Sequence, residues 1–200
     1  MGLGFEENVK GAMDFVLANG LPKPIYNNFD IGSYVFYRGY PKYKVFVDGR
    51  PEAYPAQFFT GVYIPSQSDY KNFKEVEEIY QFKTIIFSHT DQTPWGRNFL
   101  QNVVKDSEWK AVYVDDFMIV LTSLARPGLA RLVPIDLSKL NPSSYRFDNH
   151  MSYLRLGLFL ASTGNNEAAG QFIKKTLQFF PDSPIANSLI GRPIQNNFFW

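Results

Sequence analysis

The sequence predicts an α/β fold: a mixed, mostly parallel sheet with flanking helices and an edge hairpin, followed by a C-terminal helical hairpin. Three observations predict it. Short apolar runs alternate with amphipathic stretches over residues 1–125, the pattern of strands and helices that pack in layers. The pair Asp115-Asp116 separates two strand-like runs, as in a β-hairpin. After residue 150 the apolar spacing is that of helices.

The individual elements follow from local signals taken in chain order. Asn19-Gly20 ends the first helix, because glycine adopts the left-handed conformation that closes a helix. Asp30 is a candidate N-cap for the second helix, and Thr93 followed by Pro94 is a favoured start for a later one. The predicted helices are 5–18, 30–37, 73–80 and 94–104; the predicted strands are 25–27, 45–47, 82–88, 109–114 and 117–121; residues 54–68 are predicted as an irregular or helical connection.

The composition divides the chain into an α/β domain at 1–125, a linker rich in Pro and Ser at 126–149, and a helical part at 150–200. Within the helical part, one stretch resembles a single tetratricopeptide repeat (TPR) of 34 residues. The matching positions are Tyr153, Leu156, Gly157, Gly164, Ala169, Phe172, Leu177 and Pro181. The resemblance implies a TPR-like helical hairpin with its turn at Gly164. Because such units need about three copies for stability, a single pair must bury its apolar face on the α/β domain or on further repeats.

Charge and composition exclude several classes of function. Lys and Arg number 20 against 19 Asp and Glu, and this balance argues against a nucleic-acid partner, since no basic excess exists to neutralise phosphates. The absence of Cys excludes disulfides and Cys nucleophiles. With no glycine-rich phosphate loop after a strand and only two His, neither a cofactor nor a metal site is predicted. No apolar run reaches the ~18 residues of a membrane span, so the chain taken alone is expected to be soluble.

Polar side chains at the predicted strand ends form the candidate binding site, because α/β proteins bind ligands at that edge of the sheet. The candidates are Asn27, Asn28, Asp30, Tyr34, Asp48, Arg50, Tyr54 and His89. Two interpretations remain open. The carboxylates could serve catalysis, with Asp48, Glu52 and His89 as a metal-dependent hydrolytic set. They could equally be structural, with Asp30 capping a helix and Asp48 paired with Arg50 to hold a turn. No His, Lys or Cys stands at a spacing from these carboxylates that is typical of a catalytic site, and this favours the structural interpretation.

Two segments carry a resemblance to a known class of proteins. Tyr26–Val35, followed by Pro41-x-x-Lys-Val-Phe-Val-Asp-Gly-Arg-Pro-Glu-Ala-Tyr54, resembles a recurring segment of membrane glycosyltransferases of the GT-C superfamily, which use lipid-linked sugars. The run from Trp109 to Val120 is similar to the closing hairpin of the same domain. Ile31 stands where Trp is usual, and Ser33 where a second Gly is usual. Both departures are mild.

The resemblance implies a function without catalysis in this chain. In that superfamily the catalytic carboxylates lie on loops between membrane helices, and the domain that the chain resembles follows the last of those helices. The chain is therefore expected to be a non-catalytic domain on the extracytoplasmic face of a membrane, possibly cut from a longer protein. Its expected partners are the membrane part of its own parent protein and a carbohydrate acceptor or lipid-linked sugar. The alternatives are the stand-alone hydrolase and a TPR-type module that binds a protein through the helical hairpin.

Overall fold

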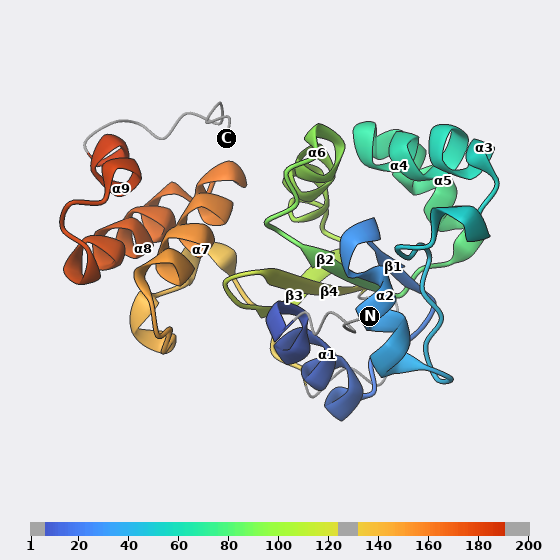
Figure 1. Cartoon of the computed structure of the whole chain (residues 1–200), viewed down its shortest axis with the longest axis horizontal. Coiled ribbons are helices and arrows are strands. Elements are labelled where there is room, and N and C mark those ends of the chain that lie inside the picture. The colour runs from blue at the N-terminus through green and yellow to red at the C-terminus, as the bar shows by residue number, and fades with distance from the viewer. Residues whose placement is uncertain (1–6, 124–131, 191–200) are drawn as a thin grey trace. The chain divides into compact units, whose positions relative to one another are not determined.

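A computed structural model describes residues 7–123 and 132–190 of the chain (Figure 1). The chain divides into two units, Met1–Pro134 and Ile135–Trp200, which are described separately. The helices of the first unit are α1 (Glu7–Asn19), α2 (Phe29–Gly39), α3 (Ala56–Phe58), α4 (Ile64–Ser68), α5 (Tyr70–Tyr80) and α6 (Pro94–Val103), with a 3-10 helix at Pro51–Ala53 and a π-helix at Phe59–Tyr63. Its strands are β1 (Ile25–Asn27), β2 (Thr84–Ser88), β3 (Trp109–Val114) and β4 (Met118–Ser123).

The four strands form one mixed sheet in the order β1-β2-β4-β3. β1 runs parallel to β2, with Ile25 opposite Thr84. β4 lies antiparallel to both of its neighbours, and Ser88 at the end of β2 pairs with Met118 at the start of β4. The predicted mixed α/β class and its edge hairpin are confirmed. With a single parallel pair, however, the described sheet is not mostly parallel.

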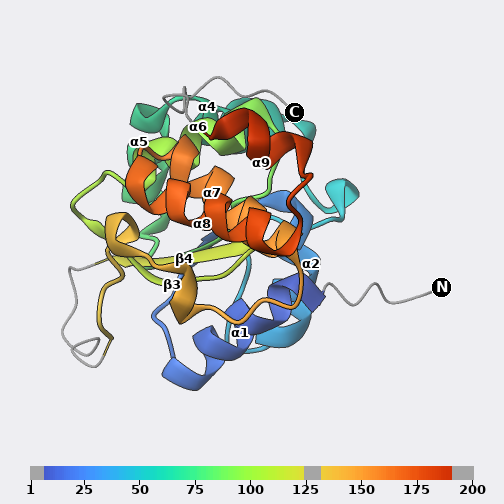
Figure 2. The same ribbon diagram turned by 90° about the vertical axis from the view of Figure 1, so that its left-hand side faces the viewer.

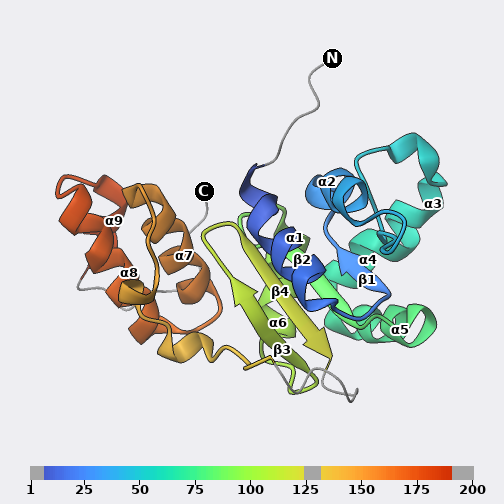
Figure 3. The ribbon, with the colours of Figure 1, turned by 90° about the horizontal axis from the view of Figure 1, so that it is seen from below.

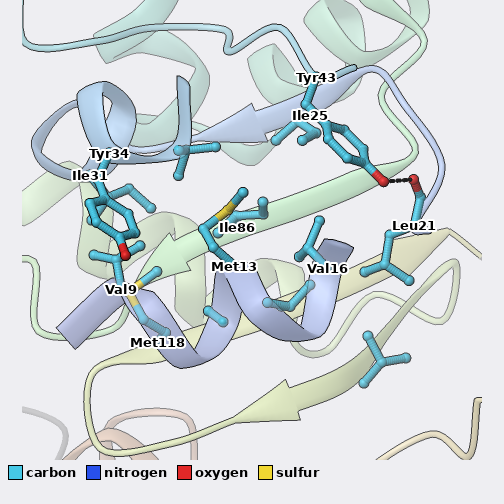
Figure 4. Close-up of a cluster of buried hydrophobic side chains, with 14 residues drawn as sticks. Val9, Met13, Val16, Leu21, Ile25, Ile31, Tyr34, Tyr43, Ile86 and Met118 are labelled. Atoms are coloured by element: carbon cyan, nitrogen blue, oxygen red, sulfur yellow. Dashed lines mark hydrogen bonds between the residues drawn. The ribbon is translucent and has the colours of Figure 1, made fainter. Parts of the chain in front are cut away.

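Helices cover both faces of this sheet. α1 crosses β4 and β3 on one face, as Figure 3 shows from below, and α2 packs beside it. The buried cluster on this face joins Met13 and Val16 of α1 to Ile86 and Val120 of the sheet (Figure 4). In the same cluster the Tyr43 hydroxyl donates to the Leu21 carbonyl oxygen across 2.8 Å, which places the segment after α2 against the end of α1.

The opposite face carries an aromatic core, which accounts for the high aromatic content. Tyr26 of β1 is fully buried and contacts the rings of Phe46, Phe73, Phe82 and Phe99 at centroid distances of 5.1–5.2 Å. These rings come from the segment after α2, from α5, from the residues just before β2 and from α6. Aromatic pairs at such distances add to the free energy gained by burying their area. The core therefore fixes α5 and α6 against the end of the sheet where β1 lies.

Two predicted details of this unit are wrong. Residues 45–47 form no strand, because the backbone of Phe46 and Val47 is bonded to the side chain of Asn27 and joins no ladder. Asp30 is not the N-cap of the second helix, which begins at Phe29 with Asn28 as its cap residue. The Asn28 side chain makes no capping bond in α2 and reaches across to β2 instead.

The second unit is a helical hairpin with a short third helix. Its elements are 3-10 helices at Leu137–Lys139 and Pro142–Ser144, then α7 (His150–Ser162), α8 (Asn166–Phe179) and α9 (Pro184–Leu189). Figure 2 shows α8 lying along α7. Gly157 faces Phe172 and Ile173 of α8, and Gly164 turns the chain with φ +86°. The predicted hairpin is thus confirmed. Both 3-10 helices contact α8, so residues 135–149, expected as linker, belong to this unit.

Candidate functional site

The end of β1 is fastened to the segment after α2 by a fully buried side chain. Asn27 donates from Nδ2 to the carbonyl oxygens of Val47 (2.7 Å) and Asn28 (2.9 Å). Its Oδ1 accepts from the Phe46 backbone N–H at 3.0 Å. Buried backbone groups must find partners, and here one side-chain amide supplies partners for three of them. Asn27 is therefore committed to the fold, and its polar atoms are not free for a ligand.

Asp48 and Arg50 form the pair that the structural interpretation predicted. The Asp48 side chain is 1% exposed and accepts from the backbone N–H and from Nε of Arg50, both at 3.1 Å. Nη2 of Arg50 completes the contact, and the guanidinium lies over the Phe36 ring at 5.4 Å. The neighbouring Asp48 carboxylate raises the pKa of Arg50. Because Nε and Nη2 already bind Asp48, one of the two edges of the guanidinium that can grip an oxyanion with two bonds is occupied.

The other predicted site residues make separate contacts and do not form one site. The Tyr34 hydroxyl accepts from Arg38, and Tyr54 stacks on Phe58 at 5.1 Å. His89 is buried and donates from Nε2 to the Asp115 carbonyl oxygen at 2.8 Å, which fixes its tautomer. Glu52 is exposed in the 3-10 helix that follows Arg50. Within residues 7–123 and 132–190, no group of three or more His, Asp or Glu could hold a metal ion. The described geometry gives the set of Asp48, Glu52 and His89 no support as a metal centre.

A pocket of about 590 Å³ lies at the edge of the sheet where β1 and β2 end, and Asp30 is the one predicted site residue in its lining. Its lining comes from the first turn of α1, the first turn of α2, the segment after β2 and the start of β4. The lining residues are Asn8, Val9, Asp30, Ile31, Ser88, Thr90, Asp91, Gln92, Thr93, Phe117 and Met118. Its volume lies within the ~300–1,000 Å³ typical of small-molecule sites. The carboxyl edge of parallel strands is also where α/β proteins bind ligands.

The floor of the pocket is a network that joins the ends of the two parallel strands. Asn28 is fully buried; its Oδ1 accepts from the Ser88 backbone N–H at 3.0 Å, and its Nδ2 donates to Asp91 at 3.3 Å. The other Asp91 oxygen accepts from the Thr93 backbone N–H at 2.8 Å. The Ser88 and Thr90 hydroxyls bond each other at 2.9 Å. These bonds hold Asp91 and the hydroxyls in place before any ligand arrives.

Gly96 explains why Asp91 can occupy this position. A Cβ at Gly96 would lie 2.8 Å from the Asp91 carboxyl carbon and 2.9 Å from Thr93 Oγ1. Only a residue without a side chain lets the carboxylate and the cap residue pack against the first turn of α6. The Thr93 hydroxyl then accepts from the Gly96 backbone N–H at 3.1 Å, as a predicted N-cap should.

Asp30 is the second carboxylate of the pocket, on the first turn of α2. It is exposed at the rim, and within the described residues it makes no hydrogen bond or ion pair. Partial burial, and then the nearby charge of Asp91, raise the pKa of Asp30 above its usual value of 3.8. The negative charge of Asp91 disfavours a second negative charge on Asp30. Asp30 is thus the one predicted site residue whose polar atoms face the pocket unpaired.

Most of this pocket was missed in the sequence. The run from Ser88 to Thr93 directly follows the clearest predicted strand, and that placement was the available signal. Only His89 was singled out there, and it turns away to bond the hairpin turn. Asn8 and Met118 come from elements that no spacing rule connects to Asp30.

Comparison with protein-family models, with curated proteins and with solved structures finds no match to the chain. Among the residues that the structure describes, no helix combines the length and apolar character needed to cross a bilayer.

Proposed function

We propose that this chain is a non-catalytic domain of a larger membrane-bound protein that resembles the GT-C glycosyltransferases, and that its pocket binds a sugar-bearing ligand. The pocket between Asp30 and Asp91 is the observation that carries the proposal. In this proposal the domain lies on the extracytoplasmic face of the membrane and packs on the membrane part of its own parent. The ligand is the acceptor or the sugar of a lipid-linked donor.

The chemistry of the lining supports a sugar. Sugar hydroxyls both donate and accept hydrogen bonds, and the pocket offers carboxylate, hydroxyl and amide groups from Asp30, Asp91, Thr90 and Gln92. Carboxylate acceptors give the stronger, charge-assisted bonds to such hydroxyls. Val9, Ile31, Phe117 and Met118 supply apolar contact for the C–H faces of a ring. A pocket with mostly apolar walls and a few fixed polar groups is the usual form of a small-molecule site.

The same carboxylate pair favours a second candidate, glycoside hydrolysis. Glycosidases use two carboxyl groups, of which one has a raised pKa and acts as the acid. Asp30 has a raised pKa beside Asp91, and burial is the first cause. Against this candidate, both oxygens of Asp91 already accept hydrogen bonds, from Thr93 and Asn28. Incubation with nitrophenyl glycosides separates the candidates, because a binding domain leaves them intact.

Two experiments test the proposal. The gene's full reading frame should encode several apolar spans of about 20 residues in addition to this chain; a frame without them contradicts the membrane-bound parent. A glycan array and vesicles with a lipid-linked sugar should retain the purified protein, and Asp91→Asn should reduce retention. Glu78→Gln is the matched control, since it removes an exposed carboxylate on α5 that lies outside the pocket. Equal retention of both variants would contradict binding at this pocket.

The second unit supports a further part of the proposal. A TPR-like pair exposes residues that neighbouring repeats or a protein partner can cover, and Phe179 and Phe180 at the end of α8 are 51% and 41% exposed. We propose that this hairpin contacts a protein partner, namely the membrane part of its own parent protein. Exchanging both rings for Ser should abolish co-purification with that part and leave glycan retention unchanged.

A further inference from the structure

We infer that the pocket selects an uncharged sugar ring and excludes the phosphate or carboxylate of an anionic sugar. The inference rests on the proposed function and narrows its ligand class. In a lipid-linked donor, the neutral sugar would then occupy the pocket while the phosphate lies outside it. Asp30 and Asp91, which both line the pocket, act as acceptors for ring hydroxyls.

The charge of the lining is the first argument. Its eleven residues include two acids and no Lys, Arg or His. An anion in this pocket would approach two carboxylates, and the lining holds no cation to offset the repulsion between these like charges. A neutral polyol meets no such cost, because its hydroxyl protons complete the hydrogen bonds of the same carboxylates.

The N-termini of the helices at the pocket give the second argument. A helix N-terminus can attract phosphate through its unpaired N–H groups. At α6, however, the Thr93 N–H donates to Asp91 and the Gly96 N–H donates to the Thr93 hydroxyl. At α2, the Phe29 N–H donates to the Tyr63 hydroxyl at 2.7 Å, and Asp30 places a negative charge in the first turn. The protein's own groups thus occupy these three N–H donors, and Asp30 opposes the dipole of α2, which would otherwise favour an anion.

Preorganisation is the third argument. Asp91 is held by Asn28 and Thr93 and backed by Gly96, so its position is set before binding. A site that is already ordered loses less entropy when the ligand arrives. Asp30, by contrast, has no partner among the described residues and is available to a hydroxyl on the open side. One fixed and one available acceptor can hold two neighbouring hydroxyls of a ring.

The test compares matched neutral and anionic probes on the full chain. Glucose is paired with glucuronate, and mannose with mannose 1-phosphate, in NMR titrations of isotope-labelled protein at pH 7. We expect at least one neutral probe to shift the amide signals of Thr90 and Gln92, and its anionic partner to bind at least tenfold more weakly. Asp91→Asn and Asp30→Asn should each weaken the neutral probe about tenfold, whereas Glu78→Gln should not change its affinity.

Other outcomes decide between this inference and the proposed function. If the anionic partner binds the pocket as tightly as the neutral probe, the inference is overturned and sugar binding stands. A neutral probe that shifts signals only around Asp48 and Arg50 also overturns it. If no sugar, neutral or anionic, binds anywhere, the proposed function itself fails. Gln92→Ala supplies a variant of an exposed residue that leaves the network intact, so loss of affinity there reports the pocket and not misfolding.

Discussion

The Asn27 side chain donates to the Val47 carbonyl oxygen across 2.7 Å, although the two residues stand twenty positions apart in the chain. With the bond from the Phe46 N–H to Asn27 Oδ1, this contact gives a side chain the role that a neighbouring strand would have. The segment after α2 is therefore held at the end of β1 without joining the sheet. The same segment presents Asp48 to Arg50, so one buried amide positions that pair as well.

Replacing this amide should cost stability. We expect Asn27→Ala to lower the free energy of unfolding by about 2–4 kcal/mol, because three buried backbone groups lose their partner. Urea denaturation followed by circular dichroism measures the change. Ser33→Ala is the control, because the Ser33 hydroxyl accepts a single exposed bond from the Gly49 N–H. If both variants lose the same small amount, the amide does not hold the segment.

Gly32 should tolerate no side chain, because α2 packs directly on the same segment. A Cβ at Gly32 would overlap the Val47 carbonyl oxygen and lie 2.6 Å from the Asp48 Cα. We expect Gly32→Ala to destabilise the protein by about 2 kcal/mol or more, as overpacking against backbone does. Gly61→Ala is the matched control, since a Cβ there meets nothing within 4 Å. Thermal unfolding of the two variants should differ clearly; similar melting temperatures would contradict the close packing.

The Asp48–Arg50 pair should show coupling in a double-mutant cycle. Arg50→Met leaves the buried Asp48 carboxylate without its cation, and we expect the free energy of unfolding to fall. Asp48→Asn in the Arg50→Met background should cost less than Asp48→Asn alone, because the partner is already absent. Arg50→Lys should restore little, since an ammonium cannot supply Nε and Nη2 together. Additive losses in the cycle would show that the pair contributes no mutual stabilisation.

Asp30 should make stability depend on pH in a defined direction. Its pKa is raised in the folded chain, first by partial burial and then by Asp91. Between the usual pKa of 3.8 and the raised value, the folded protein binds more protons than the unfolded chain. The free energy of unfolding therefore falls as pH rises through this window. Asp30→Asn should remove that fall and be the more stable form at pH 7.

Thermal melts from pH 3 to pH 8 measure this effect. The advantage of Asp30→Asn over the unmutated protein should shrink as pH falls from the raised pKa towards 3.8, and it should be absent below 3.8, where the carboxyl is protonated in both states. Glu78→Gln is the control, since it removes an exposed carboxylate on α5 that lies outside the pocket, and at pH 7 its effect should be smaller than that of Asp30→Asn. A difference in melting temperature between Asp30→Asn and the unmutated chain that stays constant from pH 3 to pH 8 would contradict the raised pKa.

In the second unit, two glycines of the hairpin should respond with opposite sign. A Cβ at Gly157 would lie 3.2 Å from both Phe172 and Ile173, so Gly157→Leu should separate α7 from α8 and destabilise by about 2 kcal/mol or more. Gly170 in α8 has open space at the same point. Gly170→Ala should stabilise by about 0.5–1 kcal/mol, because alanine loses less entropy in a helix. The rates at which a protease cleaves the two variants measure this: Gly157→Leu should be cleaved faster than the unmutated chain, and Gly170→Ala more slowly.

The predictable parts of the fold share one property: their signals are local. The Thr93-Pro94 start of α6, the glycine turn at Gly164 and the Asp115-Asp116 hairpin are each written in a few adjacent residues. The pairing of Asp48 with Arg50 was predictable for the same reason, since a single residue separates them.

The failures arose where distant residues replace a local partner. Val45–Val47 is apolar and buried like a strand, but composition cannot tell a ladder from the side chain of Asn27. Asp30 has the residue type of an N-cap, but the helix begins one residue earlier. The pocket depends on Asp30 and Asp91 meeting after β1 and β2 align in parallel, and no spacing in the sequence encodes that meeting.

The direction of β4 has a consequence for how this protein can change over time. Since β4 begins where β2 ends, the hairpin turn of residues 115–117 stands at the mouth of the pocket, and Phe117 forms part of its wall. His89 anchors that turn through both its backbone N–H and its ring, to Phe117 and Asp115. Insertions between these two anchors would deepen or narrow the opening and leave every strand in register. Changes in this one loop can therefore alter the shape of the pocket without altering the buried core.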